Sequence, residues 1–176
     1  MNTNSVRFFK ENSVENSGKS SELILAVWKA SNAENIGKII RLAHNVGALQ
    51  LLFILGEEQH RLSKIKKTAG FSFEQQNWKF ISEEEFEREV LADYSLTVLE
   101  TCNGAKDLFT ASIPERTVLL AGSESKGIPT HIIEKSSLQL YIPMPGECKS
   151  MNVSNALSVA AFEWFRQQTY QGGIKY

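Results

Sequence analysis

The sequence predicts an α/β fold in which a mostly parallel sheet is flanked by helices. Short apolar runs alternate with stretches of helical periodicity, and several of these runs have no polar face. Strands that are apolar on both faces are typical of parallel sheets covered by helices. With 176 residues, of which 42% are hydrophobic and 22% charged, the chain has the size and composition of one globular domain. In such sheets ligands bind outside the carboxyl ends of the strands.

The expected strands share short apolar runs, and the expected helices share apolar residues at helical spacing. The strands are residues 23–29, 48–55, 78–81, 95–101, 117–122 and 138–144. The helices are residues 36–46, 57–69, 82–91, a short helix that ends at 135, and 153–168. Gly47 is expected to close the first helix as a C′ residue, and Ser82 is expected to cap the third.

The polar N-terminal stretch, residues 1–21, is expected to be a short helix or a loosely held arm, and residues 22–176 form the domain proper. It has no apolar segment typical of a secretory signal, and no apolar run in the chain is long enough to span a membrane. Cys102 and Cys148 form no CxxC pair, which favours free thiols in a reducing cytoplasm. The three histidines are scattered, so no metal site is expected.

The net charge of −1 and the pI near 6.3 are not those of a typical nucleic-acid binder. Any contact with nucleic acid must therefore depend on local patches of positive charge. The stretch RLSKIKK, residues 61–67, is one candidate. The alternative interpretation is a solvated face of a helix.

The stretch NAENIGKIIR opens the first long helix. A glycine inside a helix costs about 1 kcal/mol relative to alanine, and a close backbone approach at Gly37 would explain that cost. Arg41 follows one turn later and projects from the same face as Gly37. The alternative is an ordinary capped helix with one exposed arginine.

The stretch LLAGSESKGIP joins a buried strand to a short helix, with Pro129 expected in the first helical turn. Its glycine spacing is similar to that of a P-loop. Ile128 and Pro129 stand where lysine and serine or threonine should follow, which excludes nucleotide hydrolysis. Glu124 is a carboxylate held between two glycines at the strand tip, where the alternative interpretation is a solvated turn.

The stretch IPMPGECKSMNVSNALSVAAFEWF leads into the last helix. Ser150, Asn152 or Ser154 can each cap that helix, but capping explains only one of them. The remaining polar groups imply a ligand with a polar tip. The helix itself is apolar almost all round, so it must be covered on every side. One sheet covers one side, and we therefore expect a homodimer with residues 153–168 in the interface.

Taken in order, NAENIGKIIR, LLAGSESKGI and IPMPGECKSMNVSNA resemble the three motifs of the SpoU (TrmH-like) branch of the SPOUT methyltransferases. These enzymes transfer a methyl group from S-adenosylmethionine (SAM) to ribose 2′-hydroxyls of RNA. The resemblance covers residues 23–165, most of the chain. It implies a C-terminal deep trefoil knot, which sequence physics alone would not propose. It also implies a homodimer with the site near the interface.

The resemblance also assigns roles to individual residues. Asn35 and Arg41 match the first motif, Glu124 the second, and Ser150 and Asn152 the third. These five residues are the expected catalytic set, in which Arg41 acts on the 2′-hydroxyl either as a base or as an electrostatic stabiliser. The expected cofactor-binding residues line a SAM pocket: Gly122, Leu140, Ile142, Ser150 and Met151.

The expected function is therefore SAM-dependent methylation of an RNA ribose, with tRNA favoured over rRNA because the chain has no added RNA-binding domain. Two other classes remain open on the residues alone. One is a non-catalytic, dimeric RNA-binding protein with the same fold, and the other is an α/β enzyme for a small nucleotide.

Overall fold

The computed structural model describes residues 5–12, 14, 21–56, 60–90, 92–123 and 127–170. The strands are β1 (Glu22–Trp28), β2 (Gln50–Ile54), β3 (Trp78–Ile81), β4 (Ser95–Leu99), β5 (Lys106–Asp107), β6 (Arg116–Gly122) and β7 (Leu138–Tyr141). The helices are α1 (Ser5–Glu11), α2 (Ala33–Val46), α3 (Leu62–Ala69), α4 (Ser72–Gln75), α5 (Glu83–Glu85), the π-helix η1 (Phe86–Val90), α6 (Thr130–Ile133) and α7 (Val153–Thr169).

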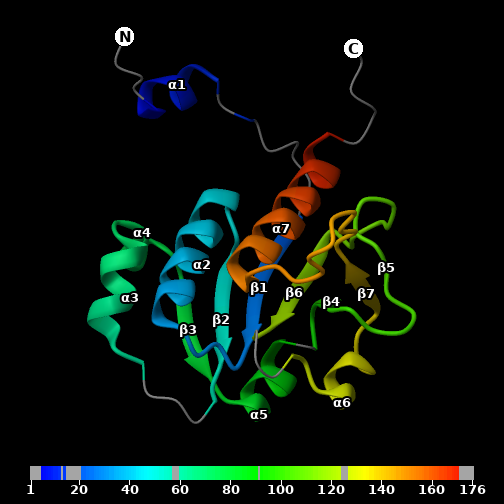
Figure 1. Ribbon diagram of the computed structural model, residues 1–176. Helices are drawn as coiled ribbons and strands as arrows, with labels where there is room; N and C mark the ends of the chain where they lie inside the picture. The colour runs from blue at the N-terminus through cyan, green and yellow to red at the C-terminus, as the bar shows by residue number, and fades with distance from the viewer. Residues whose placement is uncertain are drawn as a thin grey trace.

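The strands form a seven-stranded sheet with the order β3-β2-β1-β6-β4-β7-β5 (Figure 1). Every paired strand in it runs parallel to its neighbour. The predicted α/β class and the parallel sheet are thus confirmed. All the expected strands are present, whereas the edge strand β5 was missed because two residues carry no periodic signal.

The expected helices are also present, with shifted ends. The predicted helix at residues 57–69 begins at Leu62 as α3, because residue 60 is not helical and Arg61 is the N-cap; residues 57–59 lie outside the described part of the chain. The predicted helix at 82–91 begins with Ser82 in a capping box and continues as the π-helix η1, which the sequence did not indicate. Pro129 is the N-cap of α6 rather than a residue of its first turn. None of the helices in the described ranges is both long and apolar enough to cross a bilayer.

The sheet has an apolar core on each face, because successive side chains of a strand point to opposite sides. On β1, Leu23, Leu25 and Val27 belong to the core beneath α2 and α7, which lie in front of the central strands in Figure 1. The alternate residues of β1 belong to the second core, which η1 and α6 cover through Phe86 and Ile132. This two-sided burial explains why the strands have no polar face.

Helix α2 is fixed at both ends and along one side. Asn32 caps its N-terminus by accepting hydrogen bonds from two backbone N–H groups, and Gly47 closes it with a left-handed φ of 71°. The close approach expected at Gly37 is confirmed. A Cβ atom there would lie 2.6 Å from Thr68 Cβ and 2.8 Å from the backbone oxygen of Ile65. Glycine therefore lets α3 pack directly against α2.

Candidate functional site

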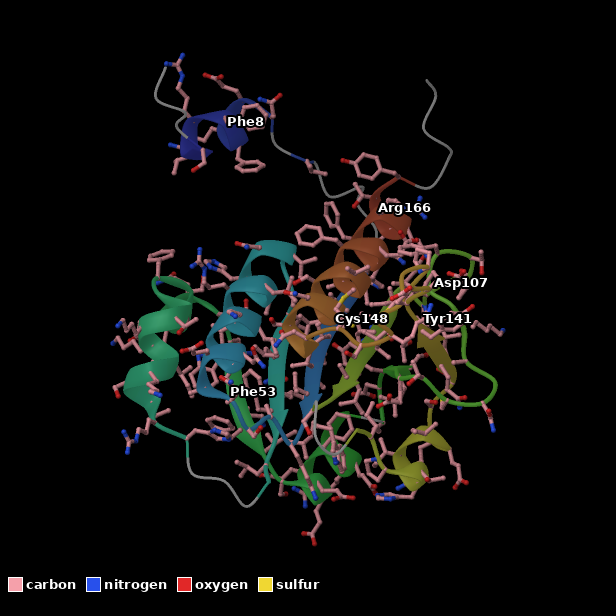
Figure 2. All side chains as sticks on the ribbon, in the orientation of Figure 1. Phe8, Phe53, Asp107, Tyr141, Cys148 and Arg166 are labelled. Atoms are coloured by element: carbon pink, nitrogen blue, oxygen red, sulfur yellow. The ribbon has the colours of Figure 1, made fainter. Side chains whose placement is uncertain are left out.

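A cavity of about 360 Å³ lies at the carboxyl edge of the sheet, where the loops after β4, β6 and β7 meet the start of α7. Ligand pockets usually have volumes of roughly 300–1,000 Å³. Figure 2 labels Tyr141 at the end of β7 and Cys148 in the following loop, the segment that forms one wall. The lining residues are Leu99, Glu100, Thr101, Ala121, Gly122, Ser123, Gly127, Tyr141, Ile142, Met144, Lys149, Ser150, Met151, Val153 and Ala156. The cavity lies at the edge that the sequence predicts.

Part of the wall at the end of β6 is formed by backbone, where Gly122 and Gly127 lie in close contact. A Cβ atom on Gly122 would lie 2.6 Å from the carbonyl carbon of Gly127. Gly127 has a φ of 60°, and its N–H donates to the carbonyl oxygen of Ser123 at 3.0 Å. Glu124, the acidic residue of the second motif, lies outside the described residues.

The end of β4 contributes a carboxylate to the cavity. Glu100 is partly buried, and its Oε1 accepts a hydrogen bond from the backbone N–H of Thr101 at 3.0 Å. Burial raises the pKa of the neighbouring Cys102 thiol, and the negative charge of Glu100 raises this pKa further. Lys149 is the cation on the described wall, and its Nζ donates to the carbonyl oxygen of Met144 at 2.6 Å.

Of the residues expected to bind the cofactor, Gly122, Ile142, Ser150 and Met151 line this cavity together. Leu140 does not line it. Its side chain is fully buried in the core between the sheet and α7, since β7 places it on the inner face. Any effect of Leu140 on a ligand is therefore indirect, through packing.

The first and third motifs meet through two asparagines. Asn152 caps α7, and its Oδ1 accepts hydrogen bonds from the backbone N–H of Ser154 at 3.0 Å and from its hydroxyl at 2.6 Å. Its Nδ2 donates to Oδ1 of Asn35 at 3.2 Å. Asn35 is buried and Ser150 is exposed at the cavity. The cap identified by the structure is thus Asn152, which leaves the Ser150 side chain at the cavity wall.

Arg41 lies apart from this asparagine pair. It is exposed on α2, and it forms no hydrogen bond or ion pair with a residue that the structure describes. Asn35 and Arg41 are six positions apart, and at 100° per residue their side chains leave the helix about 120° apart. A single chain therefore does not bring the Arg41 guanidinium to Asn35 or Asn152.

A second, shallower groove lies between the N-terminal ends of α2 and α3. Its lining includes His60, Arg61 and Lys64 together with Asn32 and Glu34. Arg61 and Lys64 are the cations among these lining residues, and Lys38 and Arg41 are exposed further along α2. Lys66 of the same predicted stretch is held in an ion pair with Glu74 at 2.7 Å.

One histidine does meet carboxylates in the described part of the chain. The candidate ligand atoms of Glu83, Glu87 and His131 lie within 4.8 Å of one another. His131 Nε2 contacts Glu83 Oε1 at 2.7 Å, and Glu87 is paired with Lys135 at 2.6 Å. An exposed ion-pair network accounts for these contacts.

Glu100, Thr101 and Lys149 line the cavity but were not singled out from the sequence. A signal for the first two did exist, because polar residues that directly follow a buried parallel strand lie at its carboxyl end, where ligands bind.

A parallel α/β domain whose ligand cavity is built from three strand-end loops is an arrangement typical of cofactor-dependent enzymes. Comparison with protein families places the chain within that class. The model described as "SpoU rRNA Methylase family" matches residues 22–162, and the chain belongs to this family.

Two curated relatives match over nearly their full length. The chain is 35% identical over 149 residues to a tRNA (cytidine(34)-2′-O)-methyltransferase of Saccharophagus degradans, covering 78% of this chain and 90% of that enzyme. It is 32% identical over 161 residues to the enzyme of the same name from Aeromonas hydrophila, covering 87% of this chain and 99% of that enzyme.

Two solved structures share the fold, each with a TM-score of 0.76. One comes from work described as "Structural insights into the 2-OH methylation of C/U34 on tRNA". It is 27% identical, and the match covers 86% of this chain and 99% of that chain. The other is an AdoMet-bound rRNA methyltransferase from Sinorhizobium meliloti, 24% identical, with 85% of this chain and 57% of that chain covered. This second likeness concerns the fold alone.

Proposed function

We propose that the protein transfers a methyl group from SAM to a ribose 2′-hydroxyl of tRNA, at nucleotide 34. The observation that carries the proposal is the convergence of the loops after β4, β6 and β7 on one cavity, with the third-motif Ser150 in its wall. Membership of the SpoU family supplies the reaction class. The alternative of a non-catalytic RNA-binding protein is disfavoured, because the cavity and the motif residues are retained.

The cavity suits SAM in both shape and chemistry. Ile142, Met151 and Val153 offer apolar walls for an adenine ring, and Glu100 and Lys149 offer one charge of each sign. The hydroxyl oxygen of Ser123 is buried and has no hydrogen-bond partner within the described part of the chain, so it is available to a ligand. When bound, SAM supplies a methyl group on a sulfonium, which is already a good leaving group.

The choice of tRNA over rRNA depends on the relatives. The family description names rRNA, but the curated enzymes that the chain covers end to end are named for cytidine 34 of tRNA. The chain covers little more than half of the rRNA methyltransferase from S. meliloti. A chain of this length thus resembles the compact tRNA enzymes.

The catalytic role belongs to Arg41, supported by the other motif residues. A free guanidinium has a pKa above about 12 and is a poor base. Arg41 therefore binds the phosphate next to the target ribose and stabilises the alkoxide that develops at the 2′-oxygen. The Asn35–Asn152 hydrogen bond fixes the start of α7 and the position of Ser150. Glu124 takes part in this set as the acidic residue of the second motif.

A homodimer through α7 completes the site. Leu157 and Trp164 of α7 are buried against the core, whereas Phe162 is 47% exposed and Phe165 is only partly buried. The centroids of these rings lie 6.4 Å apart, and Phe165 also packs against the edge of the core. A second copy that packs against these rings hides them and can bring its own Arg41 to the cavity, since one chain does not.

The finer description of the domain is also part of the proposal. The family match begins at residue 22 and no residue of α1 is buried, which supports an arm at residues 1–21 and a SPOUT methyltransferase domain at residues 22–176. The proposal also includes a C-terminal deep trefoil knot. The loop from β7 to α7 shares a cavity with the loops after β4 and β6, which is the pocket that the family resemblance assigns to the knotted loops. The free Cys102 and Cys148 fit a cytoplasmic location.

The test of the function combines genetics with mass spectrometry. Total tRNA from a strain that lacks the gene is expected to lose one 2′-O-methyl group, at nucleotide 34, and purified protein with labelled SAM is expected to restore it. A matched tRNA with a 2′-deoxy nucleotide 34 should accept no label. Label at guanosine 18 or in rRNA would contradict the substrate, and no label in any RNA would contradict the activity.

Substitution of Phe162 tests the dimer. Phe162→Glu is expected to weaken dimerisation by about 30-fold or more, because a buried aromatic anchor contributes roughly 2 kcal/mol or more to an interface. Sedimentation velocity over a concentration series measures the change, and methyl transfer should fall in parallel. The control is Phe71→Glu, since Phe71 is 76% exposed but lies at the α3–α4 turn. An unchanged oligomeric state of Phe162→Glu would exclude this interface.

A further inference from the structure

We propose that Glu100 and Ser123 bind the two ribose hydroxyls of SAM, so that a side-chain carboxylate at the end of β4 selects the cofactor by its diol. This inference rests on the proposed function, because it assigns contacts to the same cofactor. Neither residue belongs to the catalytic set. Both line the cavity, one after β4 and one after β6.

One carboxylate oxygen of Glu100 accepts a hydrogen bond, and the other accepts none from the described residues. Its Oε1 accepts the hydrogen bond from the Thr101 N–H at 3.0 Å. Its Oε2 lies against the glycine wall, 3.0 Å from where a Cβ atom of Gly122 would stand and 3.3 Å from that of Gly127. Glu100 forms no ion pair with any residue in the described ranges. An anchored carboxylate with lone pairs to spare is a preorganised acceptor for hydroxyl donors.

Ser123 adds a neutral hydroxyl to the same wall. It is 7% exposed, and its Oγ has no hydrogen-bond partner among the residues that the structure describes. Leaving a buried hydroxyl unsatisfied costs roughly 1–3 kcal/mol, so a ligand that satisfies it gains affinity. A hydroxyl both donates and accepts, which matches another hydroxyl better than it matches an ion.

The diol is a better match for this wall than the ammonium group of the methionine part of SAM. In SAM the ammonium group stands beside a carboxylate. A site for this part of SAM therefore needs an anionic side chain for the ammonium and, next to it, a cationic side chain for the carboxylate. The cation of the cavity, Lys149, comes from the exposed loop before α7, whereas Glu100 is at a strand end beside backbone glycines. A carboxylate that accepts from a ribose diol is also the arrangement used by dinucleotide-binding α/β proteins.

The experiment measures binding by calorimetry, apart from catalysis. The ligands are S-adenosylhomocysteine, 5′-methylthioadenosine, which keeps the diol but lacks the amino acid, and the 2′,3′-dideoxy form of 5′-methylthioadenosine. Glu100→Gln is expected to weaken the first two by about tenfold or more and to leave the third unchanged. The control Glu147→Gln removes an exposed carboxylate of the loop before α7 that does not line the cavity, and should change none.

Ser123→Ala provides an independent variant. Affinity for both diol ligands is expected to fall by about 3- to 10-fold. The melting temperature of the free protein should stay the same or rise, because the substitution removes a buried, unsatisfied hydroxyl. A purely structural serine would give the opposite result, a lower melting temperature with unchanged affinity.

The outcomes separate this inference from the proposed function. If the wild-type protein binds neither S-adenosylhomocysteine nor 5′-methylthioadenosine, the function itself is wrong. If it binds both and Glu100→Gln binds them equally well, only the assignment of the diol is overturned. If Glu100→Gln lost affinity for S-adenosylhomocysteine alone, Glu100 would belong to the ammonium group, and the assignment to the diol would again be overturned. In the wild-type protein, removal of the diol from the ligand should lower the affinity about tenfold. This result does not depend on whether the variants fold.

Discussion

Arg41→Ala is expected to lower the rate of methyl transfer by about 100- to 1,000-fold, the usual effect of removing a donor that stabilises a developing oxyanion. Affinity for S-adenosylhomocysteine should stay within about twofold, because the proposed role of Arg41 is to contact the RNA phosphate and the 2′-oxygen rather than the cofactor. Single-turnover assays with labelled SAM and calorimetry measure the two quantities separately.

Two further variants serve as comparisons for Arg41→Ala, one a conservative substitution and one a control. Arg41→Lys keeps the charge but loses the planar fork that binds a phosphate through two hydrogen bonds, so it should recover only part of the rate. Asn45→Ala, one turn further along the exposed side of α2, is the matched control and should change neither quantity. A folded Arg41→Ala protein that no longer binds S-adenosylhomocysteine would remove Arg41 from its catalytic role.

Gly122→Val is expected to weaken binding of S-adenosylhomocysteine by about 5- to 100-fold. Its Cβ atom would overlap the Gly127 backbone at 2.6 and 2.8 Å, and its methyl groups would enter the cavity. Overpacking costs roughly 1–3 kcal/mol, and about 3 kcal/mol corresponds to a factor of about 100 in affinity. Calorimetry checks the affinity, and urea unfolding should show a loss of stability of about the same size as the overpacking cost.

The control for Gly122→Val is Gly146→Val in the loop before α7. A Cβ atom on Gly146 would meet nothing within 4 Å, so neither stability nor affinity should change. Gly122→Ala should fall between the two, since it keeps the backbone overlap but adds no methyl groups. If Gly122→Val bound the ligand as well as the wild-type protein, the cavity at the end of β6 could not be the cofactor site.

Much of the fold could be predicted from local patterns. The capped helix α2 and its closing Gly47 follow from residues that are neighbours in the chain, and so does the buried strand β1. The short elements α4 and β5 could not be predicted, because they arise from packing rather than from periodicity. The π-helix η1 likewise depends on how Phe86 enters the core.

The candidate site could also be predicted only in part. The motifs indicated Ser150, Asn152 and Gly122, which lie in or beside the cavity. They did not indicate Glu100, because a single carboxylate after a strand carries no motif. The separation of Arg41 from Asn35 follows from their spacing of six positions on one helix. The hydrogen bond between Asn35 and Asn152, in contrast, depends on how α2 packs against α7.

The sequence by itself determined the parallel α/β class, because hydrophobic periodicity and helix caps act between residues close in the chain. The resemblance of three motifs indicated the family and the loops that carry the site. Only the tertiary structure decided which side chains meet. Asn35 and Asn152 are 117 positions apart and yet share a hydrogen bond, and Glu100 reaches the wall formed by Gly122 and Gly127. The order of the strands in the sheet creates these contacts, and no local pattern in the chain encodes that order.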